Sequence, residues 1–156
     1  MNAADYHMCH YYDSSALVKL YVEEQGSSRI EELVESAPAG TKVVSRLTIV
    51  EVTSALVRRS RGGDYSDEHV AQVLHLLEED MASFQVIELG GAVMSRAISL
   101  VRKHGLRAAD AIQLASALLG RGESGLQARL VLVSSDQDLN AAARQEQLEI
   151  LDPTAV

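Results

Sequence analysis

The stretch Leu130-Val131-Leu132-Val133-Ser134-Ser135-Asp136 decides the fold that this sequence predicts. Its first four residues are all apolar, which is typical of a strand buried on both faces of a parallel sheet. Polar residues follow at once, so Asp136 stands just past the carboxyl end of that strand. Because open α/β sheets bind ligands beyond the carboxyl ends of their strands, Asp136 is the first candidate site residue.

Working outward from this strand, short strands alternate with helices along the chain. The other predicted strands are Met8–Tyr12, Lys42–Ser45, Phe84–Leu89 and Leu148–Leu151. The predicted helices are Ser15–Glu23, Ser27–Ser36, Thr48–Ser60, Ser66–Ala82, Ala92–His104, Ala108–Leu119 and Gln137–Gln145, with a loop at Gly120–Gln127. This alternation predicts an α/β protein, a three-layer α/β/α sandwich around a short, mainly parallel central sheet.

Length and composition narrow the class of protein further. A chain of 156 residues predicts one domain, 1–156, in which residues 1–7 show no structural pattern and are candidates for disorder. Cys9 is the only cysteine, and the sequence has neither a signal-peptide pattern nor an apolar run of membrane-spanning length, so we expect a cytoplasmic protein that does not enter a membrane. The net charge of -8 counts against binding duplex DNA by charge alone.

Three further acids share the predicted position of Asp136 at one edge of the sheet. Asp13 directly follows the first strand, and Glu51 and Asp110 lie in the first turns of two predicted helices. Helix starts face the same rim as the strand ends in a doubly wound sheet. Each acid also has a purely structural explanation, as a helix cap, as a capping-box partner of Thr48, or as a first-turn acid that complements the helix dipole. Taken together, acids set among apolar neighbours fit a shared cation better than four unrelated caps.

Clustered carboxylates suit the chemistry of hard divalent cations. Mg²⁺ and Mn²⁺ prefer oxygen ligands, and the ion removes the repulsion between neighbouring carboxylates. One or two such ions activate water and neutralise the charge of a phosphodiester. The acidic composition is compatible with such a site, because bound metal reverses the local charge.

Four segments of the chain resemble the PIN-domain ribonucleases, and in particular the VapC-type toxins of toxin–antitoxin pairs. They are Tyr12–Tyr21, Ser45–Leu56 around Glu51, Leu106–Leu118 around Asp110, and Leu132–Leu139 around Asp136, in the family's order and spacing. The resemblance implies a PIN-like fold and a Mg²⁺- or Mn²⁺-dependent endoribonuclease that hydrolyses single-stranded or loop RNA. It also implies a cognate antitoxin protein and a homodimer as partners.

By the same resemblance, Asp13, Glu51, Asp110 and Asp136 form the catalytic, metal-binding acidic site. Ser134 matches a serine or threonine that orders the site, Ser14 or Ser15 contacts metal-bound water or phosphate, and Asp138 is an accessory acid with an equally good reading as a solvated first-turn residue. Gln113 departs from the pattern, since many relatives have a histidine there, and this puts local substrate contacts in doubt.

Two basic clusters are candidates for contact with RNA. Arg102, Lys103 and Arg107 lie close in sequence to Asp110, and Arg58 and Arg59 lie with Arg61 at a predicted helix end, where the helix dipole alone favours positive charge.

Two other function classes stay open at this point. A phosphatase or phosphotransfer domain would use a strand-end aspartate as nucleophile, but the second aspartate two residues after Asp13, or the later lysine, that such a domain needs is absent. A non-catalytic binding module is the third reading, and the intact acidic set argues against it.

Overall fold

A parallel five-stranded sheet forms the centre of the computed structural model, which describes residues 8–123 and 129–155. Its strands are β1 (Cys9–Tyr12), β2 (Lys42–Ser45), β3 (Gln85–Ile87), β4 (Leu130–Val133) and β5 (Glu149–Leu151). The strand order is β3-β2-β1-β4-β5, and all four pairings are parallel. The apolar stretch at 130–133 is therefore an inner strand, as its composition predicts.

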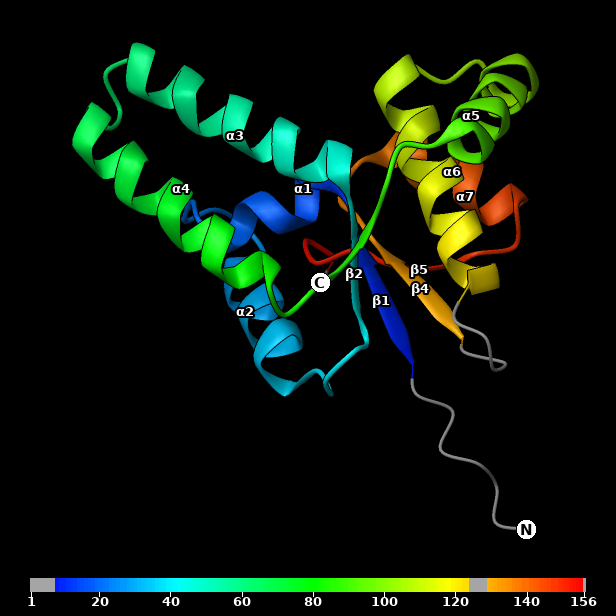
Figure 1. The fold of residues 1–156 in the computed structure, drawn as a ribbon, viewed down its shortest axis with the longest axis horizontal. Coiled ribbons are helices and arrows are strands. Elements are labelled where there is room, and N and C mark those ends of the chain that lie inside the picture. Colours follow the sequence, from blue (N-terminus) through cyan, green and yellow to red (C-terminus); the bar gives the residue numbers. More distant parts are fainter. Residues whose placement is uncertain (1–7, 124–128, 156) are drawn as a thin grey trace, which may run out of the picture.

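Helices cover both faces of this sheet (Figure 1). They are α1 (Ser14–Leu17), the 3₁₀ turn η1 (Val18–Leu20), α2 (Ser27–Ser36), α3 (Arg46–Arg61), α4 (Asp67–Met81), α5 (Gly91–His104), α6 (Ala108–Glu123) and α7 (Gln137–Gln145). Helices α1 to α4, with η1, lie on one side, and α5, α6 and α7 lie on the other. The predicted three-layer α/β/α sandwich with a parallel sheet is confirmed.

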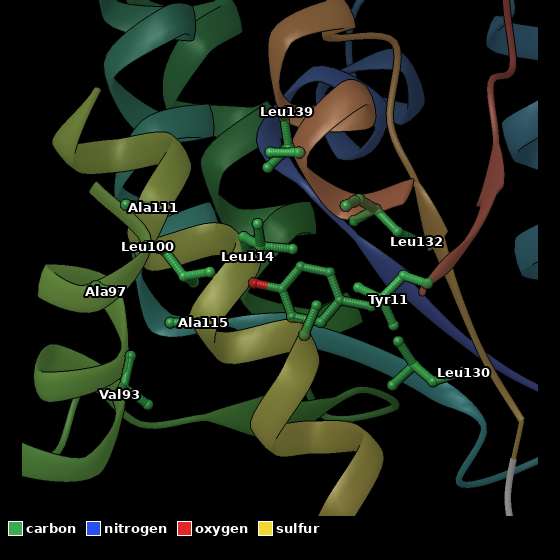
Figure 2. Close-up of a cluster of buried hydrophobic side chains, with 14 of the residues drawn as sticks. Tyr11, Val93, Ala97, Leu100, Ala111, Leu114, Ala115, Leu130, Leu132 and Leu139 are labelled. Carbon is green, nitrogen blue, oxygen red and sulfur yellow. The ribbon is translucent and has the colours of Figure 1, made fainter. Parts of the chain in front are cut away.

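Alternation along β1 assigns its side chains to two separate cores. Tyr11 packs with Leu114 and Leu132 under α5–α7, whereas Tyr12 packs on the opposite face with residues such as Val44. Figure 2 shows Tyr11 crossing the first core with its hydroxyl oxygen toward α6. The inner strands are thus held from both sides, which fixes the positions of their carboxyl ends.

Helix α3 begins two residues earlier than predicted. The Ser45 side chain caps it by accepting a hydrogen bond from the Leu47 N–H (3.0 Å). Thr48 is consequently inside the helix and fully buried, so the predicted capping box of Thr48 and Glu51 is wrong. Glu51 lies in the second turn of α3 and not in the first.

Several other predicted boundaries are also wrong; the strand predicted at Phe84–Leu89, for example, covers only Gln85–Ile87. The helix predicted at Ser15–Glu23 is the short α1 followed by η1, where the Tyr21 N–H bonds to the Val18 carbonyl (3.0 Å) and tightens the chain into a 3₁₀ turn. Helix α6 runs on to Glu123, so the loop predicted at Gly120–Gln127 starts too early. The predictions for residues 1–7 and 124–127 fall outside the described residues. Among the helices that are described, none has the length and apolar character needed to span a membrane.

Candidate active site

The candidate site lies where the connectivity of the sheet reverses. Strand β1 has β2 on one side and β4, which comes far later in the sequence, on the other. The Asp13 N–H donates to the Val133 carbonyl (3.2 Å), which ties the ends of β1 and β4 together. A reversal of this kind opens a crevice at the carboxyl ends of the strands. Asp13 and the Ser134–Asp136 segment both stand at this crevice, as the sequence predicts.

Asp13 is buried and fully engaged by hydrogen bonds. The residue is only 3% exposed to solvent. Its Oδ1 accepts from the Ala16 N–H (2.9 Å) and the Ser15 hydroxyl (2.7 Å), and its Oδ2 accepts from the Ser134 hydroxyl (2.8 Å). Burial raises the pKa of Asp13 to about 6, against the opposing effect of these hydrogen bonds. The side chain is both the cap of α1 and a carboxylate held in a crevice.

Ser134 and Ser15 connect Asp13 to the segment that carries Asp136. The Ser134 hydroxyl accepts from the Asp136 N–H (3.1 Å), and the Ser15 hydroxyl accepts from the Ser135 N–H (2.9 Å). Asp136 in turn caps α7, because its Oδ1 accepts from the Leu139 N–H (2.9 Å). The negative charge of Asp136 adds to the rise in the pKa of Asp13. The two strand-end aspartates are therefore caps and electrostatic neighbours at once.

Asn140 belongs to the same arrangement and was missed from the sequence. It is fully buried, and its Nδ2 donates to the Ser134 carbonyl (2.9 Å). The available signal was a polar residue on the face of α7 that otherwise buries Leu139, Ala142 and Ala143.

Asp110 brings a third element to the site. It lies in the first turn of α6, as predicted, and is half-buried. Burial raises its pKa, the carboxylates of Asp136, Glu51 and Asp138 raise it further, and the guanidinium of Arg107 opposes them. Asp110 is thus coupled electrostatically to Glu51 and Asp136, and Asp136 is coupled to Asp13, so acids from four segments of the chain are linked at this edge of the sheet.

Glu51 is held by Gln113, the residue at which this sequence departs from the family pattern. Gln113 is 2% exposed, lies three residues after Asp110 on α6, and donates from Nε2 to Glu51 Oε1 (2.7 Å). The amide oxygen of Gln113 accepts from the Tyr11 hydroxyl (2.7 Å) and the Thr48 hydroxyl (3.1 Å). An apolar periodicity in the sequence gives no sign that these three buried polar side chains meet.

The acids do not form a closed cage for a metal. Within residues 8–123 and 129–155, no three carboxylate, imidazole or thiol groups are already placed to hold one ion together. No three of the four predicted acids therefore surround one ion position in this structure. Mg²⁺ is nevertheless bound in many proteins by one or two carboxylates and several waters, which is the kind of site these acids can make.

A cavity of about 470 Å³ adjoins the acids, and it contains part of the predicted basic cluster. Asp110 and Asp138 line it together with Lys103, His104 and Arg107. Lys103 also pairs with Glu146 (2.6 Å). Ser14, half-buried, follows Asp13 directly at the start of α1.

The other predicted basic residues lie elsewhere. Arg102 lines a separate cavity with Ser95 and Ile98. In the last turn of α3, Arg58 donates to Ser54 (2.7 Å) and Arg59 pairs with Glu24 (3.4 Å).

Comparison with known proteins identifies the family to which this chain belongs. The PIN-domain family model matches residues 11–145, which include all four acids and Gln113. The chain belongs to the PIN-domain family. Ribonuclease VapC45 of Mycobacterium tuberculosis is 39% identical over 116 residues, covering 74% of this chain and 78% of the relative. The predicted enzyme class, a nuclease of VapC type, is confirmed by these two matches.

Solved structures share the fold of this PIN domain. A toxin–antitoxin complex from Klebsiella pneumoniae superposes with a TM-score of 0.66 at 18% identity, over 94% of this chain and 99% of that one. VapC20 of Mycobacterium tuberculosis, described as a sarcin-ricin loop cleaving toxin, superposes with a TM-score of 0.63 at 17% identity, over 85% and 94%. Identities this low show the fold alone.

Proposed function

We propose that this PIN-domain protein is a Mg²⁺- or Mn²⁺-dependent endoribonuclease, the toxin of a type II toxin–antitoxin pair, and that Asp13, Glu51, Asp110 and Asp136 are its catalytic acids. The observation that carries the proposal is the electrostatic coupling of these four acids where the sheet connectivity reverses. The match to relatives named ribonucleases supports RNA as the substrate.

The donor set fits a hard cation. It consists of carboxylate oxygens, two of which belong to groups whose pKa is raised by burial and by neighbouring negative charge. Such groups gain from a bound positive charge. Asp110, Glu51 and Asp136 are half-buried and would contribute the ligands that face the crevice, with Asp13 behind them. When bound, a divalent ion supplies positive charge to the phosphodiester and activates water for hydrolysis.

The serines keep this acidic group in place. Ser134 and Ser15 each touch Asp13 and also bond the backbone of the Asp136 segment, so they fix one acid relative to the other. Ser14, which directly follows Asp13, and Asp138, which lines the cavity, are accessory residues in the proposal. An aspartyl-phosphate mechanism fits less well, because both Asp13 oxygens already accept hydrogen bonds in a residue that is 3% exposed.

The test of this proposal is metal-dependent cleavage of RNA. Chelation should stop cleavage of a single-stranded or stem-loop RNA by the purified chain, and added Mg²⁺ or Mn²⁺ should restore it. The Asp110→Asn variant is the matched control, since added metal should not restore its activity. Cleavage that continues in excess chelator, or in Asp110→Asn at the wild-type rate, would contradict the proposal.

Arg107 is the cation best placed to bind the RNA backbone. It is exposed, lines the cavity beside Asp110, and makes no ion pair among the described residues. We expect Arg107→Ala, tested in an inactive Asp110→Asn background, to weaken single-stranded RNA binding about 5- to 10-fold and to reduce its salt dependence by roughly 0.7 in log–log slope. Fluorescence anisotropy titrations at several salt concentrations measure both effects.

Arg121→Ala provides the charge-matched control for that experiment. Arg121 is also exposed but lies 11 residues beyond Asp110 on α6, about 16 Å along the helix. Its replacement should leave RNA binding close to that of the parent. An equal loss in both variants would mean that net charge matters and that the cavity does not.

A cognate antitoxin and a second copy of the chain complete the proposal. A groove of about 490 Å³ between α3 and α4 is lined by Ile49, Leu74, Leu77 and Met81, and it suits an apolar helix of an antitoxin. The Klebsiella structure that shares the fold is a toxin–antitoxin complex, which supports this partner. The exposed apolar residues Met94 and Ile98 on α5 are available for a homodimer. An enzyme that cleaves cellular RNA would act in the cytoplasm.

A further inference from the structure

Gln113 links three of the elements that build the site. Its side chain bonds Tyr11 on β1, Thr48 and Glu51 on α3, while its own backbone belongs to α6. Tyr11 lies two residues before Asp13, and Gln113 lies three residues after Asp110 and therefore on the same face of the helix. One buried amide thus connects the segments that carry Asp13, Glu51 and Asp110.

The orientation of this amide is determined by its neighbours. A carboxylate can only accept, so the Nε2 of Gln113 must face Glu51, and its Oε1 faces two hydroxyl donors that use both of its lone pairs. The Tyr11 hydroxyl keeps its proton at neutral pH, as an ordinary phenol does, so it is the donor in its bond to Gln113. With the two hydroxyls fixed in the core, rotation of the amide would break three hydrogen bonds at once.

Glu51 needs such a hold because its neighbours repel it. Glu51 is half-buried on α3, and its negative charge repels that of Asp110. The negative charges of Asp136 and Asp138 also repel Asp110. A glutamate side chain with several rotatable bonds reduces this repulsion by turning toward solvent. The hydrogen bond from Gln113 keeps one oxygen in place and leaves Oε2 for another contact.

We infer that Gln113 is a positioning residue, which holds the Glu51 carboxylate beside Asp110 so that the two can bind a divalent cation. This inference rests on the proposed function, in which Glu51 is a metal ligand. Residues that hold a metal ligand through its hydrogen bonds commonly change metal affinity by 10- to 100-fold when replaced.

The test is the affinity of the purified chain for Mn²⁺, measured by titration calorimetry without RNA. We expect Gln113→Met, which keeps the volume of the side chain but removes its donor and acceptor, to weaken Mn²⁺ binding about 10- to 100-fold. Gln113→His should bind within about threefold of wild type, because a neutral imidazole also offers one donor and one acceptor. Cleavage by Gln113→Met should recover at high Mn²⁺, so that the metal requirement changes more than kcat.

Thr41→Val controls for general loss of a buried hydroxyl. Thr41 is 3% exposed, and its hydroxyl bonds the Pro38 carbonyl (2.7 Å) just before β2 begins, at the opposite edge of the sheet. This variant should lose stability without losing Mn²⁺ affinity. If Gln113→Met does not fold, Tyr11→Phe replaces it, since that change removes one of the two donors that orient the amide and leaves every acid intact.

The Glu51→Gln variant distinguishes an error in the proposed metal site from an error in the role of Gln113. If Glu51→Gln binds Mn²⁺ as wild type does, the assignment of Glu51 in the proposed function is wrong. If Glu51→Gln binds weakly while folded Gln113→Met or Tyr11→Phe binds normally, the role of Gln113 is wrong and the proposed site stands. In support of the inference, adding Gln113→Met to Glu51→Gln should cause little further loss of affinity.

Discussion

Asp13→Asn is expected to lower RNA cleavage by about 10³-fold or more and, in the same protein, to stabilise the metal-free fold. The loss follows from removing a charged oxygen from the acidic group, which costs roughly 4 kcal/mol of transition-state stabilisation. The gain in stability follows from the burial of the Asp13 carboxylate. Asp13 is 3% exposed and has a pKa of about 6 against an ordinary value of 3.8, so its ionised form opposes folding at neutral pH.

The pH dependence of that stability gives a second check on the same variant. Because folding raises the pKa of Asp13, the unfavourable contribution is absent below about pH 4, grows as the pH rises toward 6, and stays constant above. Urea unfolding with excess chelator should therefore show Asp13→Asn more stable than wild type by about 1–3 kcal/mol at pH 7.5 and nearly equal at pH 4.

Asp64→Asn provides the control for this comparison. Asp64 is exposed in the turn between α3 and α4, and the same chemical change there should alter stability by less than about 0.5 kcal/mol at either pH. A less stable Asp13→Asn variant at pH 7.5 would show that the hydrogen bonds from Ser134 and Ser15 outweigh the cost of burying the charge.

Glu146→Ala is expected to cause the largest loss of stability among changes to charged residues. The Glu146 carboxylate is 9% exposed and receives Lys103 Nζ (2.6 Å), His104 Nε2 (2.7 Å) and Arg96 Nη2 (3.2 Å), all from α5. Removing it leaves His104, whose side chain is 4% exposed, without this partner. We expect a loss of about 2–3 kcal/mol, or roughly 5–10 °C in Tm.

Glu149→Ala tests whether burial explains the loss of stability expected for Glu146→Ala. Glu149 pairs with Arg129, but its side chain is 44% exposed and that of Arg129 is 61% exposed. Screening by solvent makes such a pair contribute less than about 1 kcal/mol. Differential scanning calorimetry of the two variants should separate them clearly. Lys103 and His104 also line the cavity beside Asp110, and Glu146→Ala removes the negative charge paired with them, so RNA binding by the folded variant should not weaken.

The sequence was sufficient for the parts of this molecule that depend on local pattern. The apolar stretch Leu130–Val133 predicted an inner parallel strand, and strand ends followed by acids predicted where Asp13 and Asp136 would lie. These predictions work because the carboxyl ends of parallel strands must meet at one edge of the sheet. The first turn of α6, with Asp110, followed from the same reasoning.

Contacts between distant side chains were beyond the reach of local pattern. Gln113 meets Tyr11 across 102 residues and Glu51 across 62, and neither spacing nor periodicity encodes such a meeting. Asn140 was missed for the same reason. The start of α3 was misjudged because Ser45 and Thr48 are equally good caps in sequence, and only the burial of Thr48 in the folded protein decides between them.

The bond between the Ser134 hydroxyl and Asp13 spans 121 residues, and this separation has a consequence for synthesis. Strand β1 leaves the ribosome first, but its neighbour β4 and the start of α7 are made only after α2 to α6 and the strands between them. A nascent chain that stops before Leu130 therefore has Asp13 without Ser134 or Asp136, and the proposed acidic site is not assembled. If the proposed site is correct, the chain would be unable to cleave the RNA of its own ribosome until the segment that carries Ser134 and Asp136 has been added.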